Sequence, residues 1–169
     1  MLFTQVVFWL LAVGVIVTAG LVVVGPGAKN PLYGAIALII SFFFIAGIYV
    51  LTLAHTLAVL QILVYAGAIM VLFMFVIMLL NLSKKELGDE TKTVAKGVGI
   101  IGALAIGVKM VLVVDASDTL VAQTLPPDFG TVGSLGDLLF HDYLVPFELT
   151  GLLLLVAVIG AVVLAKRTL

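Results

Sequence analysis

The polar residues best placed for chemistry lie in one long apolar stretch in the middle of the chain. Gln61 and Tyr65 are four residues apart, so in an α-helix they share a face and lie within hydrogen-bonding reach. Gly67 follows between two alanines, and a glycine inside a helix costs about 1 kcal/mol relative to alanine. Such a glycine favours a close helix contact or a change of winding such as a π-bulge, which occurs mostly at functional sites. Spacing alone favours the close contact.

Three methionines continue the same stretch at helical spacing. Met70, Met74 and Met78 recur every four residues, a pattern typical of adaptable apolar packing. By itself this stripe predicts a packing surface and no chemistry.

Two charged residues lie inside other apolar stretches. Lys109 is the only basic one, and an uncompensated lysine at the centre of a bilayer costs roughly 2.5–3.5 kcal/mol. Because Lys109 is near the predicted end of its stretch, we expect its long side chain to reach the interface as an anchor; a proton path is the alternative. Glu148 is the only acid and follows Pro146 in the predicted first helical turn, where the helix dipole favours a carboxylate. For Glu148 the alternative is a proton relay or a subunit contact.

Other kinds of site find no support in the sequence. The absence of cysteine excludes thiolate catalysis and cysteine-bound iron–sulfur clusters. His55 and His141 are far apart in sequence and do not argue for a metal. Residues 97–102 match G-x-G-x-x-G, but a dinucleotide site needs a strand before the glycines, whereas these lie in an apolar stretch that favours close helix packing. We therefore expect no catalytic, cofactor-binding or metal-binding residue in this chain.

The elements that must position these residues are set by the composition. Of the 169 residues, 64% are hydrophobic and 10% charged, against about 25% charged in globular domains. The mean hydropathy is +1.40, so lipid must solvate most of the chain. The net charge of −1 provides no basic face for nucleic acid. The sequence predicts an integral membrane protein.

Five apolar stretches are long enough to cross a bilayer. The second begins with Asn30 as a helix N-cap and Pro31 at the first helical position. The fourth is the weakest, because it is short, rich in glycine and interrupted by Lys109. We predict an all-α fold with five transmembrane helices in a single membrane domain over residues 1–169, with spans at about residues 3–24, 31–53, 57–80, 97–114 and 145–165.

The basic residues predict how these spans are oriented. Lys29, four lysines in residues 81–96, and Lys166 and Arg167 fall on one side of a five-span chain, seven in all. The other side has none outside a span, and residues 115–144 carry five aspartates in what we expect to be an irregular outer loop. Since basic loops stay inside, we predict an outside N-terminus, a cytoplasmic loop at 81–96 and a cytoplasmic C-terminus.

Three segments resemble one protein family. Residues 61–82, QILVYAGAIMVLFMFVIMLLNL, closely resemble the third helix of the J subunit of bacterial proton-pumping NADH:quinone oxidoreductase, respiratory complex I. That subunit corresponds to mitochondrial chain six. Residues 30–35, NPLYGA, and residues 139–148, LFHDYLVPFE, resemble the starts of its second and fifth helices. The resemblance covers nearly the whole chain.

The resemblance implies a subunit without redox centres, in a translocase whose quinone, FMN and iron–sulfur clusters belong to partner subunits. Its partners would be the quinone-site subunit, the small K-type subunit and the adjacent antiporter-like subunits, in the inner membrane of a bacterial cell. In this family the third helix can carry a π-bulge at the tyrosine, here Tyr65, and its conversion to α-helix is implicated in opening a proton path. The implied coupling hinge comprises Gln61, Tyr65, Gly67 and Met70.

One departure from the family pattern concerns Gln61. Many relatives have glutamate there, and a glutamine can orient water by hydrogen bonding but cannot load and release a proton. Two other functions stay open at this point. A subunit of a multi-chain cation/proton antiporter, or a small transporter, would be expected to show more carboxylates inside the spans. A purely structural scaffold would differ only in having a third helix that keeps one winding.

Overall fold

The computed structural model describes residues 2–23, 30–80, 93–116 and 125–166. Within these residues the secondary structure consists of helices and turns, with no strand. The helices are α1 (Leu2–Val23), α3 (Pro31–Leu51), α4 (His55–Leu60), the π-helix η1 (Gln61–Ile69), α5 (Met70–Leu80), α6 (Thr93–Ala116), α7 (Val132–Phe140) and α8 (Leu144–Ala165).

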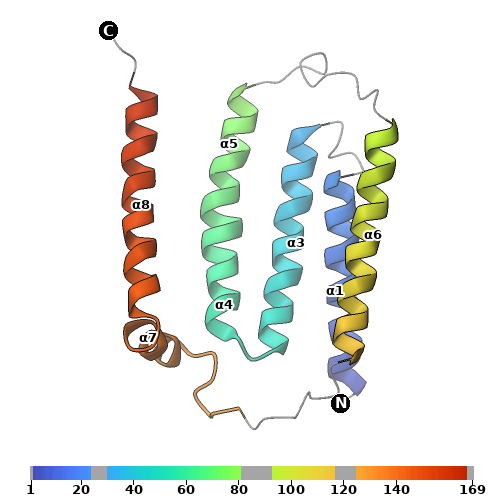
Figure 1. Cartoon of the computed structure of the whole chain (residues 1–169), viewed down its shortest axis with the longest axis horizontal. Helices are drawn as coiled ribbons and strands as arrows, with labels where there is room; N and C mark the ends of the chain where they lie inside the picture. Colours follow the sequence, from blue (N-terminus) through green and yellow to red (C-terminus); the bar gives the residue numbers. More distant parts are fainter. Residues whose placement is uncertain (1, 24–29, 81–92, 117–124, 167–169) are drawn as a thin grey trace.

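Long helices run side by side, and α7 lies across one end of the molecule (Figure 1). The elements α4, η1 and α5 follow one another without a break and form one helix of 26 residues; we call this unit helix three. By length and composition, four helices can cross a membrane: α1, α3, helix three and α8. The predicted fourth span falls in α6, whose apolar described part is the shorter segment Gly99–Met110. The all-helical membrane class is thus confirmed, with four of the five predicted spans.

The start of α3 follows the predicted capping pattern. Asn30 has an extended backbone, and its side-chain oxygen accepts a hydrogen bond from the backbone N–H of Leu32 at 3.1 Å. Pro31 occupies the first helical position, where its missing N–H costs nothing. The helix ends at Leu51, two residues before the predicted end, because Leu53 takes a left-handed backbone with φ of 62° and turns the chain into helix three.

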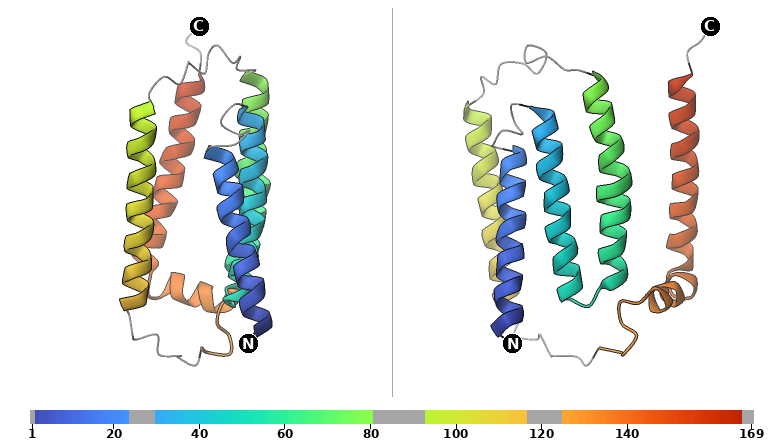
Figure 2. Two further views of the ribbon diagram at one scale, coloured as in Figure 1. Left: turned by 90° about the vertical axis from the view of Figure 1, so that its right-hand side faces the viewer. Right: turned by 180° about the vertical axis from the view of Figure 1, so that it is seen from behind.

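The best-packed part of the chain is the layer in which α3 lies between α1 and helix three (Figure 2). Helix α3 supplies half of the buried residues among those described, and they are small: Gly34, Ala35, Ala37, Ser41 and Ala46. Small side chains let membrane helices approach closely, so dispersion contacts between backbones and large neighbours hold them together.

Two glycines make the α1–α3 contact reciprocal. A Cβ atom on Gly14 of α1 would lie 3.0 Å from ring atoms of Phe44 on α3. A Cβ atom on Gly47 of α3 would lie 3.0 Å from Leu11 on α1. Each helix therefore inserts a large side chain against a bare stretch of the other. The buried hydroxyl of Thr18 donates to the carbonyl of Gly14 at 2.7 Å, which satisfies it within α1.

The prediction of an irregular loop over residues 115–144 was wrong in part. Helix α6 continues to Ala116, and residues 132–140 form α7. Helix α7 begins because Thr131 is an N-cap whose hydroxyl accepts a hydrogen bond from the N–H of Ser134 at 3.3 Å. Gly133 and Gly136 lower the helix propensity of this segment, which hid the helix from a reading by composition.

Helices α6 and α8 stand apart from the packed layer (Figure 2). Helix α8 contacts α7, with Phe140 and Phe147 stacked edge to face at 5.1 Å between ring centroids. None of the 22 residues of α8 is buried by the described chain. Its surface is mainly Leu, Val, Ile and Ala, a composition suited to lipid or to other membrane helices.

Candidate functional site: the π-wound third helix

The middle of helix three is wound as a π-helix over Gln61–Ile69. At its end the backbone N–H of Met70 bonds to the carbonyl of Tyr65, five residues back instead of four. The spacing of the buried residues agrees with this winding. In helix three they are Ala58, Gln61, Ala66 and Met70, so five residues separate Gln61 from Ala66. The π segment thus keeps one face of the helix against α3 by adding a residue to the turn.

Gly67 lies inside this widened turn. A Cβ atom there would be 3.2 Å from the carbonyl oxygen of Ile62, five residues earlier in the same helix. A methyl group would require this backbone to give by a few tenths of an ångström, and a β-branched side chain would require more. The sequence left two interpretations of Gly67 open, a close helix contact or a change of winding. In the structure, the close neighbour of a Cβ atom at Gly67 belongs to a turn of the same helix.

Tyr65 and Gln61 are separated by the winding. The ring of Tyr65 meets Phe42 of α3 edge to face, with centroids 5.8 Å apart and an interplanar angle of 69°. Gln61 is 8% exposed and faces the packed layer, whereas Tyr65 is 49% exposed. These two described side chains form no hydrogen bond with each other, contrary to the expectation for a regular α-helix. The buried residue that follows Gln61 in this segment is Ala66, five residues on, so Ala66 takes the place on the packed face that a regular α-helix would give to Tyr65.

Only the first methionine of the stripe is a packing residue in this chain. Met70 is buried against the layer, Met74 is partly buried and Met78 is 58% exposed. The side chain of Met70 therefore lies where the π-helix ends and the regular winding of α5 begins. This places it with Gln61, Tyr65 and Gly67 on one continuous segment.

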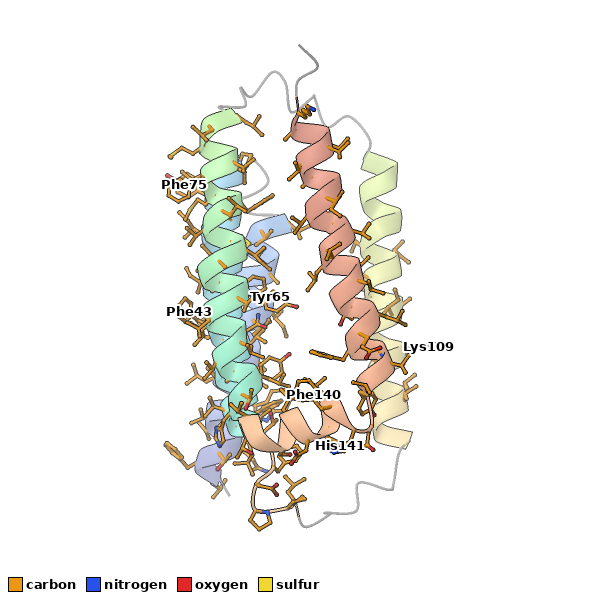
Figure 3. All side chains as sticks on the ribbon, turned by 90° about the vertical axis from the view of Figure 1, so that its left-hand side faces the viewer. Phe43, Tyr65, Phe75, Lys109, Phe140 and His141 are labelled. Carbon is orange, nitrogen blue, oxygen red and sulfur yellow. The ribbon has the colours of Figure 1, made fainter. Side chains whose placement is uncertain are left out.

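Lys109 and Glu148 do not join this segment or each other. Lys109 is exposed on α6, where Figure 3 labels it, and Glu148 is exposed on α8. These two helices lie at opposite sides in the view of Figure 1. The prediction that Glu148 lies in the first helical turn was wrong, because α8 begins at Leu144 and has no acidic residue in that turn. The favourable interaction of a carboxylate with the helix dipole falls off within the first turn, so it does not explain the position of Glu148.

Phe42 could not be identified in advance as the aromatic partner of Tyr65, because it is one of three consecutive phenylalanines on α3. In the part of the chain that the structure describes, no three His, Cys, Asp or Glu side chains gather as a metal site. The described residues therefore offer no ligand set for an iron–sulfur cluster, and what distinguishes the site is its backbone winding.

Comparisons with known proteins agree with the resemblance of residues 61–82. Residues 27–164 match the family model described as NADH-ubiquinone/plastoquinone oxidoreductase chain 6. The chain is 39% identical to NADH-quinone oxidoreductase subunit J of Rhodobacter capsulatus, over 95% of this chain and 80% of the relative. It is 36% identical to NADH-quinone oxidoreductase subunit 10 of Thermus thermophilus, over 92% and 86%.

A third relative shows that the similarity extends to enzymes named for another electron donor. F(420)H(2) dehydrogenase subunit J of Methanosarcina mazei is 33% identical, over 95% of this chain and 89% of the relative. The matches cover nearly the whole sequence, so they include the π-wound helix and the packed layer. The predicted resemblance is confirmed: this chain belongs to the NADH-ubiquinone/plastoquinone oxidoreductase chain 6 family of membrane subunits of complex I.

Proposed function

We propose that the chain helps couple quinone reduction to proton translocation, as a membrane-arm subunit without redox centres whose third helix changes its winding. The observation that carries the proposal is the π-helix at Gln61–Ile69, with Gly67 and Tyr65 inside it. π segments are rare and occur mostly at functional sites.

Conversion of the π segment to α-helix would turn one half of helix three relative to the other. Removing the extra residue of a π turn shifts the following residues by one position, or about 100° of rotation. Met70 would then leave the face that packs on α3, and the Tyr65 ring would leave Phe42. A hydrogen bond within a membrane protein is worth about 0.6–2 kcal/mol, and a mid-helix glycine costs about 1 kcal/mol. Energies this similar permit two windings of helix three.

Exposure of α6 and α8 supports the role of a subunit. Membrane subunits bury such helices against neighbours, and the relatives that match this chain are named as parts of quinone oxidoreductases. We propose the quinone-site subunit, the small K-type subunit and the adjacent antiporter-like subunits as neighbours. Quinone, FMN and iron–sulfur clusters would belong to partner subunits, and Lys109 and Glu148 would serve as an interfacial anchor and a subunit contact.

Purification of the chain in mild detergent tests the subunit role. We expect flavin-containing and iron–sulfur subunits to travel with it, together with quinone reductase activity. Mass spectrometry identifies the subunits, and absorbance spectra identify the flavin. A chain that purifies alone, or with antiporter subunits only, would contradict the proposal.

We also propose the inner membrane of a bacterial cell as the location, with α6 as a fifth span, an outside N-terminus and a cytoplasmic C-terminus. The chain has no cysteine of its own, so single cysteines at Ser83 and Ser117 are specific probes for an impermeant thiol reagent in intact cells. The basic residues of 81–96 predict labelling at Ser117 and protection at Ser83. Labelling at Ser83 and protection at Ser117 would reverse the orientation.

A further inference from the structure

The N-terminal end of helix three is bonded to a segment that is 74 residues away in sequence. The carbonyl oxygen of Gly130 accepts two hydrogen bonds from Thr56: one from the backbone N–H at 3.0 Å and one from the hydroxyl at 2.7 Å. Thr56 is only partly exposed, so water competes weakly for these bonds. We call this pair of residues the Thr56–Gly130 latch.

The second residue of the latch, at position 130, has to be a glycine. Gly130 has a left-handed backbone with φ of 74°, a conformation that costs little for glycine and more for other residues. A Cβ atom at this position would overlap the carbonyl oxygen of Leu53. Leu53 is itself left-handed, in the turn between α3 and α4. Two tight turns therefore meet backbone to backbone at the start of helix three.

The latch continues without interruption into α7 and α8. Thr131 follows Gly130 directly, caps α7, and donates its hydroxyl to the carbonyl of Asp128 at 2.7 Å. At the far end of α7, Phe140 stacks on Phe147 of α8. A short path of hydrogen bonds and packed rings thus connects α8 to helix three, although these helices do not pack extensively on each other.

The latch is close to the π segment. Thr56 precedes Gln61 by five residues, or about 7.5 Å along the helix axis. If one end of a helix is held, a change of winding inside the helix must turn the free end. Rotation of the η1 segment would then be delivered to the half of helix three that contains α5.

We propose that Thr56 and Gly130 are positioning residues, which hold the N-terminal end of helix three so that a change of winding in the π segment moves the α5 half. The functional part of this inference rests on the function proposed above. The latch itself, as a pair of hydrogen bonds, can be measured independently of proton pumping.

Hydrogen exchange in the purified, assembled complex tests the latch, together with the proton-to-electron ratio in proteoliposomes. Thr56→Val removes the hydroxyl and keeps the shape. We expect backbone amides of residues 54–58 and 128–132 to exchange about fivefold faster, as for the loss of one hydrogen bond, and the proton-to-electron ratio to fall. Thr56→Ser keeps the hydroxyl, so its amide exchange rates and its proton-to-electron ratio should be close to those of the unchanged complex. Thr150→Val removes a hydroxyl that is bonded to the carbonyl of Phe147 within α8. It should leave amide exchange in residues 54–58 and 128–132 unchanged.

A second variant gives an independent measure of the same contact. Gly130→Ala should accelerate exchange more than Thr56→Val, because its Cβ atom forces the two turns apart. Unchanged exchange in Thr56→Val would overturn the latch, and faster exchange with a normal proton-to-electron ratio would overturn its positioning role. If that ratio is normal in Thr56→Val but reduced when Gly67 is substituted, only the positioning role fails. If it is normal in both, the proposed function of helix three fails as well.

Discussion

Gly67→Val should give a complex that assembles but couples poorly, with quinone reduction and proton pumping both reduced. The branched side chain would meet the carbonyl of Ile62 across the π turn, where a single methyl group is already 3.2 Å from the oxygen. Overpacking of this kind costs about 1–3 kcal/mol, which would shift the ratio of the two windings by about 5- to 150-fold. The measurement is the turnover of quinone and the number of protons moved per electron in purified complex, at matched subunit content.

Two comparisons isolate the effect of winding. Gly20→Val places the same side chain on α1, where a Cβ atom has no neighbour within 4 Å, and should leave coupling close to normal. Tyr65→Phe should be milder than Gly67→Val, because the edge-to-face contact with Phe42 survives and only the hydroxyl is lost. Normal turnover and normal proton stoichiometry in Gly67→Val would mean that helix three serves as packing alone, and the scaffold interpretation would replace the coupling one.

Gly14→Leu should strongly reduce the amount of assembled complex. The new side chain would occupy the space of the Phe44 ring, which lies 3.0 Å from the Cβ position. A leucine there must displace the Phe44 ring or push α1 away from α3, and either change loses contacts that organise the layer. The expected cost is the 1–3 kcal/mol of overpacking, or about a 5- to 150-fold loss of folded chain. Quantitative native electrophoresis of solubilised membranes gives the measurement.

Gly20→Leu is the matched control for this prediction. Gly20 belongs to the same helix as Gly14, and a Cβ atom there has no neighbour within 4 Å. Its complex should reach normal levels, which would separate the close α1–α3 contact from any general effect of leucine in α1. Gly47→Leu should resemble Gly14→Leu, because Leu11 stands as close to Gly47 as Phe44 does to Gly14. Equal levels of assembly in Gly14→Leu and Gly20→Leu would contradict this account of the layer.

The apolar stretches made the long helices predictable, because a bilayer demands a continuous run of hydrophobic side chains and a helix satisfies every backbone group. The capping of α3 was predictable for a local reason: Asn30 and Pro31 act on their own helix turn. These features depend on residues close together in sequence. The spans could therefore be placed to within a few residues from composition and end signals alone.

The winding of helix three could not be derived from residue spacing. The π and α patterns differ in one hydrogen-bond register, and the residues from Gln61 to Ile69 suit either. The interval of five between the buried Gln61 and Ala66 emerges only once α3 is in place. Family resemblance supplied the π-bulge, whereas spacing alone favoured a close helix contact at Gly67, with Gln61 and Tyr65 within hydrogen-bonding reach.

Contacts between distant segments likewise could not be predicted from the sequence. Nothing around Thr56 marks it as a partner of Gly130, since a threonine near a helix start is common and a glycine in a loop is commoner. The edge-to-face pairing of Tyr65 with Phe42 needs α3 and helix three to be in register. Such pairings depend on tertiary geometry.

The isolation of α8 has a consequence for how the protein is built. Since α8 packs on α7 and has no buried residue within the described chain, the α1, α3 and helix three layer can form before α8 has found its final place. A neighbouring chain can then approach α8 sideways within the plane of the bilayer, with no segment to be threaded. The order in which neighbouring chains dock on α8 is therefore not set by the order in which the helices of this chain are made.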